Sequence, residues 1–301
     1  GGSSNSLTIR PRPGQTGVAN ITITVSEPLG TSTRTKFVVA VNQPPTRGDI
    51  DGDGKADLLL QDSGGSLAAW FMDGINLKAG RFLIPGSVAG TNYRIVGSGY
   101  FNDDGQEDLV FQHTDGTLAV WFMNGITETA ASLFNPSNPG DRKWRVVATG
   151  DMDGDGKVDL VFQHTDGTLA VWFMNGINMR SAELISPSNP GDRNWKVVGV
   201  GDFDIDGKLD LLFQHTDGTQ AVWFLNRLIL SRATLLSPSS AGPDWWVMSV
   251  VDRNGDGKPD LLFQHTNSDL GVWFMNGTTL SSAQYLNPKN PVGSFKVVGP
   301  K

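Results

Sequence analysis

Acidic loops of one pattern, Asp-x-Asp-x-Asp-Gly-x-x-Asp, recur along the sequence with almost constant spacing. The last aspartates of the five copies are 51, 51, 51 and 50 residues apart, and they are Asp57, Asp108, Asp159, Asp210 and Asp260. Alternate residues of a tight loop direct their oxygens toward one point, and a hard cation that takes about 6–8 oxygen ligands is typically calcium. Magnesium requires stricter octahedral geometry, so Ca²⁺ is the predicted cofactor.

Four of the loops have nearly complete ligand sets, in which a lysine two positions before the last aspartate contributes its backbone carbonyl. The predicted metal ligands are Asp49, Asp51, Asp53, Lys55 and Asp57 in loop one; Asp151, Asp153, Asp155, Lys157 and Asp159 in loop three; Asp202, Asp204, Asp206, Lys208 and Asp210 in loop four; and Asp252, Asn254, Asp256, Lys258 and Asp260 in loop five. Asp-Gly turns without metal are common in β proteins, but four copies at fixed spacing favour metal binding.

Loop two departs from this pattern. Tyr100 and Asn102 stand where the first two aspartates are expected, which leaves Asp104 and Asp108 in register. We predict that loop two is empty or binds metal weakly. None of the loops is an EF-hand, because the twelfth position of loop one is Leu60 rather than glutamate and both flanks are strand-like.

The composition of the 301-residue chain excludes several classes of protein. Its net charge of −7 is carried largely by the loops, and without a basic stripe to neutralise phosphates we do not expect it to bind nucleic acid. Cysteine is absent, which excludes disulfides and zinc–thiolate sites. No apolar run approaches the roughly 20 residues that span a bilayer. The start Gly-Gly-Ser-Ser, without methionine, suggests a processed or trimmed chain.

The loops alternate with short strands. Each repeat has an aromatic-led strand, the acidic loop, two apolar strands and a weaker fourth strand, as in residues 144–185. We therefore predict an all-β fold over residues 47–301: a five-bladed β-propeller of four-stranded antiparallel blades, closed by the C-terminal strand. Residues 295–299 match an opening strand that repeat one lacks, which supports closure. The alternative is that these five repeats are part of a longer array with more blades.

Residues 1–46 lack the repeat and form a separate predicted segment. Two alternating stretches, 19–25 and 35–41, predict a β-hairpin, followed by a linker at 43–46. The hairpin resembles the closing part of the Ig-like or cadherin-like modules of bacterial surface proteins. Since a lone hairpin is marginally stable in water, it is expected to associate with the repeats or with a partner, including a second copy of the chain.

The repeats resemble a known family. The segment Gly150-Asp-Met-Asp-Gly-Asp-Gly-Lys-Val-Asp-Leu-Val-Phe-Gln-His is similar to the FG-GAP repeats of the integrin α-chain head and to bacterial VCBS repeats. Over residues 48–301 the resemblance implies a calcium-stabilised extracellular propeller, secreted or on the surface of a bacterial cell. It also implies adhesion, glycan binding, or a role as an appendage of secreted enzymes.

Two further residue types recur. The histidines His113, His164, His215 and His265 appear once per repeat, which favours a structural role over catalysis, with a repeated ligand site as the alternative. Aromatic residues at strand starts beside arginines are candidates for sugar stacking: Trp144 with Arg142, Trp195 with Arg193, and Trp245. Packing at the rim, with the arginine covering the ring, is the favoured alternative.

We predict a non-enzymatic module that binds a glycan or a cell-surface protein. No unpaired carboxylate, lysine or histidine breaks the repeat in a way that indicates a catalytic cleft. The alternatives are a structural assembly unit of a surface protein or filament, and a part of a secreted polysaccharide-degrading enzyme.

Overall fold

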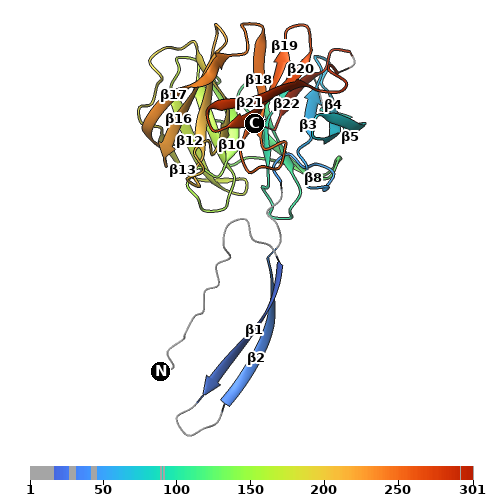
Figure 1. Cartoon of the computed structure of the whole chain (residues 1–301), viewed down its shortest axis with the longest axis vertical. Helices are drawn as coiled ribbons and strands as arrows, with labels where there is room; N and C mark the ends of the chain where they lie inside the picture. Colours follow the sequence, from blue (N-terminus) through green and yellow to red (C-terminus); the bar gives the residue numbers. More distant parts are fainter. Residues whose placement is uncertain are drawn as a thin grey trace. The chain divides into compact units, whose positions relative to one another are not determined.

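The computed structural model describes residues 17–26, 32–41, 46–88, 90, 92–291 and 293–300, and divides the chain into two compact units, Gly1–Pro45 and Thr46–Lys301 (Figure 1). In the first unit, β1 (Gly17–Ser26) pairs antiparallel with β2 (Ser32–Val41). The predicted strands at 19–25 and 35–41 lie within them. The hairpin turn and most of the predicted linker at 43–46 lie outside the described residues.

The described residues of the second unit form twenty strands in five antiparallel sets of four, here called sets one to five. Set one is β22 (Lys296–Gly299), β3 (Leu58–Gln61), β4 (Ser66–Asp73) and β5 (Asn76–Ser87); set two is β6 (Tyr93–Gly99), β7 (Asp108–His113), β8 (Leu118–Asn124) and β9 (Thr127–Leu133). Set three is β10 (Trp144–Gly150), β11 (Asp159–His164), β12 (Leu169–Asn175) and β13 (Asn178–Leu184). Set four is β14 (Trp195–Gly201), β15 (Asp210–His215), β16 (Thr219–Asn226) and β17 (Ile229–Ser240); set five is β18 (Trp245–Val251), β19 (Asp260–His265), β20 (Leu270–Asn276) and β21 (Thr279–Tyr285).

Strand positions follow from the apolar pattern. Second and third strands are apolar in nearly continuous runs, and β3 is buried along its whole length. Fourth strands are polar, and most of β13 is exposed. Asn-Gly turns join third to fourth strands in sets two, three and five, where the glycine takes positive φ, as at Gly176 with 59°. Among the described residues there is no helix, and hence none that could cross a membrane.

Parallel bridges join the outer strands of neighbouring sets. The bridge Ile84↔Thr127 merges sets one and two into an eight-stranded sheet, and Ser237↔Thr279 does the same for sets four and five. Isolated bridges of the same kind stand at the three other junctions: Asn135↔Asn178, Ser186↔Ile229 and Asn76↔Asn287. The last of these connects set five to set one.

The C-terminal strand completes set one, as predicted. β22 pairs antiparallel with β3, with Val297 opposite Leu60. The first strand of each set contacts the first strands of both neighbouring sets, and β22 contacts both β6 and β18. Apolar side chains fill the spaces between the sets, including the junction of sets five and one, where Trp70 packs in one cluster with Leu262 and Val272.

A buried glutamine also joins each set to the next. Gln163, on the second strand of set three, donates from Nε2 to the Trp195 carbonyl at 2.9 Å and accepts from the Val197 amide at 3.1 Å. The equivalent glutamines are Gln61, Gln112, Gln214 and Gln264. At the junction of sets five and one, Gln264 accepts from the amide of Val297 at 3.2 Å, but its buried Nε2 donates to no group among the described residues.

Replacing one of these glutamines should destabilise the second unit. Gln163→Met keeps the side-chain volume but leaves the Trp195 carbonyl and the Val197 amide without partners. Each unpaired buried group costs about 1–3 kcal/mol, so the expected loss is about 2–6 kcal/mol. Urea unfolding measures it, with Gln284→Met on an exposed strand as the control. Equal stability of the two variants would contradict this role.

Candidate metal centres

The first aspartate of each complete loop is held by backbone amides of its own loop. Asp49 Oδ1 accepts from the amides of Gly52 (2.8 Å) and Asp53 (3.1 Å), and Oδ2 accepts from the amide of Gly54 (2.8 Å). The same arrangement recurs at Asp151 and Asp252, and in part at Asp202. The backbone amides of the loop therefore orient the carboxylate of the first aspartate.

Carboxylate oxygens converge in three of the loops. In each group one ligand atom per residue lies within 4.8 Å of the others; the groups are Asp49, Asp51 and Asp53; Asp151, Asp153 and Asp159; and Asp202, Asp204 and Asp206. These are loops one, three and four, and every member is a predicted ligand. Within the described part of the chain, loops two and five do not form such a group.

The last aspartate of every loop is buried and accepts hydrogen bonds from at least two backbone amides. In set three, Asp159 Oδ2 accepts from the Met152 amide (2.9 Å) and Oδ1 from the Met174 amide (2.8 Å), which ties the loop to the third strand. Burial raises the pKa of Asp159 to about 7, although these hydrogen bonds act in the opposite direction. The equivalent pKa values rise to about 6 for the same reason at Asp57, Asp108, Asp210 and Asp260.

This hydrogen-bonding role was missed from the sequence, where these residues were assigned as ligands only. The pattern contained a signal for it, because loop two keeps Asp108 although it lacks the first two aspartates. Asp108 makes the same two bonds, to the amides of Phe101 (2.9 Å) and Met123 (3.0 Å). Metal ligation by the last aspartates of the four predicted loops stays a prediction, and only Asp159 lies in one of the convergent groups.

Basic side chains from the fourth strands reach three of the acidic loops. Arg180 Nη2 lies 2.8 Å from Asp153 Oδ2 and 2.8 Å from Asp155 Oδ2. Lys78 contacts Asp53 (2.5 Å), and Arg232 contacts Asp204 (3.1 Å). Each cation offsets part of the repulsion between neighbouring carboxylates.

The side chains of the loop lysines contact other polar groups. Lys55 pairs with Asp73 (2.6 Å), Lys157 with Asp103, Lys208 with Asp206 (2.7 Å), and Lys258 donates to Asn276 (2.9 Å). Only their backbone carbonyls were predicted as ligands, and that prediction stays open.

Loop two uses its variant residues to anchor the chain where it enters the second unit. The Tyr100 hydroxyl donates to the Thr46 carbonyl (3.1 Å). Glu107 is buried, and its carboxylate accepts from the Gly48 amide (3.0 Å) and the Ser98 hydroxyl (2.5 Å). Burial raises the pKa of Glu107. This arrangement gives a structural reason for the loss of the aspartate pattern in loop two.

The donor chemistry of loops one, three and four fits calcium. All three groups offer carboxylate oxygens on a short loop whose first carboxylate is already oriented, and no sulfur or imidazole ligand takes part. Oxygen ligands in a loop of alternating aspartates suit a hard cation of flexible coordination. Loop five keeps the oriented first aspartate, Asp252, but has Asn254 in place of a carboxylate.

The repeated histidines fasten turns. His164 Nδ1 lies 2.8 Å from Asp166 Oδ1, and its ring packs against Trp144 with centroids 5.0 Å apart. His215 repeats this arrangement and also reaches Asp192 through Nε2 at 3.2 Å. Hydrogen bonding to Asp217 raises the pKa of His215. These contacts support the structural interpretation of the histidines.

The candidate sugar-stacking tryptophans are half-buried at strand starts. Trp144, Trp195 and Trp245 each pack on the histidine of their own set and line surface hollows. Arg142 and Arg193 do not line these hollows. The cation–π pairs found in the described part of the chain involve Arg227, Arg232 and Lys289, so they do not show the expected cover of Trp144 by Arg142.

Comparison with known proteins places the chain in a family. The FG-GAP-like repeat family matches residues 100–162, 151–213 and 202–263, more than half of the chain. The chain therefore belongs to the FG-GAP-like repeat family. No curated protein matches it.

Three solved structures show partial likeness. The computationally designed Ika8 protein is 16% identical, and the match covers 78% of this chain and 63% of that chain with a TM-score of 0.32. Chaetomium thermophilum Raptor is 12% identical, and the match covers 79% of this chain and 24% of that chain with a TM-score of 0.39. BBS1N in complex with ARL6DN is 12% identical, and the match covers 84% of each chain with a TM-score of 0.37. The chain spans less than two thirds of the first two. At these identities and TM-scores the likenesses carry no argument about function.

Removing one carboxylate of loop three should abolish much of the stabilisation by calcium. A bound ion stabilises the folded state by RT ln(1 + [L]/Kd), about 2.7 kcal/mol at a hundredfold excess over Kd. We expect Asp153→Asn to lose about 2–3 kcal/mol in calcium and less than about 1 kcal/mol in chelator, where the ion pair with Arg180 is lost but an amide oxygen can still accept from the Asp155 backbone amide. Thermal unfolding under both conditions measures the difference. Asp104→Asn in loop two is the control, and an equal effect of both variants would contradict the assignment.

Without metal, stability should fall as pH rises from about 4 to about 7. The buried last aspartates have folded-state pKa values of about 6–7, above the unfolded value of about 4, so the folded state binds protons more tightly. The stabilisation by these protonated aspartates is fully present below pH 4. It is lost as pH rises through their folded-state pKa values, by about 1–3 kcal/mol per aspartate. Urea unfolding in chelator at pH 4.5 and pH 7.5 tests the sign. Higher stability at pH 7.5 would contradict it.

Proposed function

We propose that residues 47–301 form a closed five-bladed β-propeller, a calcium-binding and non-catalytic module for adhesion to a glycan or a cell-surface protein. The blade assignment is supported by five equivalent junctions between sets. Each junction has an outer parallel bridge, contact between first strands and a buried glutamine. The junction of sets five and one has the same bridge and strand contacts, and Gln264 makes one of the two glutamine hydrogen bonds there, which supports closure.

Calcium binding is supported by the position of the acidic loops. In sets two to five the acidic loop connects the first strand to the second, and in set one it directly precedes the second strand, β3, so all five lie at the same end of the proposed propeller. Convergent carboxylates in three loops place several negative charges close together at that end. A divalent cation in each would offset this repulsion and fix the loops, which suits a module that works in calcium-rich surroundings outside the cell.

The absence of an enzymatic role is supported by the repetition of the polar groups. His164 and His215 have the same partners in neighbouring sets, and each holds a turn of its own set. A reaction centre needs one set of groups that differs from the rest. Two departures from the repeat, Tyr100 and Glu107, instead anchor the entering chain.

Binding by several equivalent surfaces is the mode that a ring of repeats favours, because linked weak contacts combine into strong attachment. The observation that carries this proposal is the recurrence of the same surface features in successive sets. A secreted or cell-surface location, with a bacterial origin, is part of the same proposal.

A glycan array tests the proposal. We expect the fluorescently labelled full chain to bind a restricted group of glycans in calcium, and binding to weaken by at least about tenfold in chelator. The variant Asp104→Asn, in loop two, should retain calcium-dependent binding. Turnover of a polysaccharide, or failure to bind either the array or intact cells, would contradict the proposed function.

A further inference from the structure

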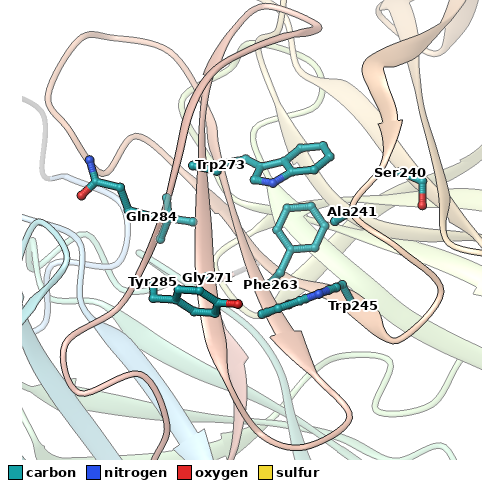
Figure 2. A pocket seen from close by; sticks show the side chains of 10 residues that line it. Ser240, Ala241, Trp245, Phe263, Gly271, Trp273, Gln284 and Tyr285 are labelled. Atoms are coloured by element: carbon teal, nitrogen blue, oxygen red, sulfur yellow. The ribbon is translucent and has the colours of Figure 1, made fainter.

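Four sets carry a surface hollow at the same place. In set five the hollow has a volume of about 330 Å³ and lies between Trp245, Trp273 and Tyr285, with Phe263 at its base (Figure 2). Hollows of about 240–250 Å³ occur at the equivalent places of sets one, three and four. All four lie on one face of their set, beside the loop that connects it to the preceding set.

The walls of the hollows repeat one chemistry. Each combines the aromatic residue that begins the first strand with the tryptophan of the third strand: Phe295 with Trp70, Trp144 with Trp172, Trp195 with Trp223, and Trp245 with Trp273. Each fourth strand adds an apolar residue whose side chain is largely exposed: Phe82 (63%), Leu184 (57%), Leu235 (53%) and Tyr285 (56%). One exposed apolar side chain needs no explanation, but the same exposure at one register position in successive sets marks a binding surface.

The charge of the hollows narrows the class of ligand. No charged side chain lines the hollows of sets four and five, although the chain as a whole carries a net charge of −7. Each of the other two hollows has one charged residue in its lining, Arg81 in set one and Glu183 in set three. The polar groups in set five are the hydroxyls of Ser240 and Tyr285 and the amide of Gln284. Mostly apolar walls with a few neutral hydrogen-bonding groups suit a neutral ligand that has both a C–H face and hydroxyls.

We propose that each hollow binds one neutral pyranose ring, stacked on the indole wall, and that the hollow of set five binds it most tightly. This inference rests on the proposed function and identifies its binding sites. The volume of about 330 Å³ in set five is at the lower end of the ~300–1,000 Å³ of ligand pockets, so one ring fits there. The hollows of the other three sets, at about 240–250 Å³, are smaller, so weaker binding is expected in them. Four such sites on one ring would attach the module to a surface that displays many copies of the sugar.

Gly271 is one residue that distinguishes the hollow of set five from the others. Gly271 lies in its hollow, where the other four sets have an alanine, Ala68, Ala119, Ala170 and Ala221. A Cβ at position 271 would lie 3.5 Å from the Trp245 ring, an ordinary contact distance. Gly271→Ala therefore narrows the hollow without strain and gives set five the residue that the other sets carry.

The test follows the indole N–H signals of the full-length chain by NMR during titration with four methyl pyranosides, of the gluco, galacto, manno and 6-deoxygalacto configurations. We expect the Trp245 and Trp273 signals to shift with at least one sugar. Gly271→Ala and Tyr285→Ala should each weaken binding at that site by about fivefold or more, and leave titration of Trp144 and Trp195 unchanged. Ser282→Ala, on the same strand and outside the hollow, is the matched control.

Three outcomes would overturn the inference. Indole signals that do not move with any of the four sugars, while the wild type binds the glycan array, would exclude the hollows and leave the proposed function intact. A sugar titration that Gly271→Ala and Tyr285→Ala leave unchanged would also exclude the hollows as the binding sites and leave the proposed function intact. Shifts that follow protein concentration instead of sugar would identify a second copy of the chain as the occupant. Failure of the array itself would count against the proposed function.

Discussion

Burial of both faces of every strand set is the constraint on which the second unit depends. The second and third strands are apolar on both sides, so a single set in water would expose a large apolar area. A neighbour on each face removes that exposure, and the proposed closed arrangement would supply two neighbours to every set. The pairing of β22 with β3 follows from this requirement, because it gives set one a complete first strand and the junction of sets five and one a continuous core.

Closure by apolar contact alone would leave the sets free to slide, and the buried polar groups remove that freedom. Gln163 fits one carbonyl and one amide of the next first strand, so a shift by one residue would leave buried groups unpaired. Asp159 acts in the same way within a set, because its two oxygens fix the loop against the third strand. The Asp159 carboxylate of the acidic loop thereby also fixes the register between the loop and the third strand.

The constant period made much of the fold predictable from the sequence. Strand positions, the acidic loops, the departure of loop two and the completion of set one by residues 295–299 all follow from spacing and apolar pattern. The role of Gln163 was not predictable, because its partners lie in the next set, 32 and 34 residues away, and no local pattern records them. The hollows were missed for a similar reason: Trp144 and Trp172 meet only once the strands are paired, while the sequence placed Trp144 beside Arg142.

The two departures from symmetry lie where the two chain ends of the second unit meet. At the start of the unit, Tyr100 and Glu107 replace a metal-loop sequence with hydrogen bonds to the entering chain. At the last junction, Arg253 is buried where the other loops have an apolar residue such as Met152 or Phe203, and its guanidinium donates to the Ala56 carbonyl (3.3 Å). Burial lowers the pKa of Arg253 to about 10, so it remains charged at neutral pH near Asp57 and Asp260. In set one the first strand, β22, has no loop joining it to the second strand, β3, because they come from opposite ends of the unit. Hydrogen bonds that involve Arg253, Tyr100 and Glu107 hold the start of this set to its two neighbours where that loop is missing.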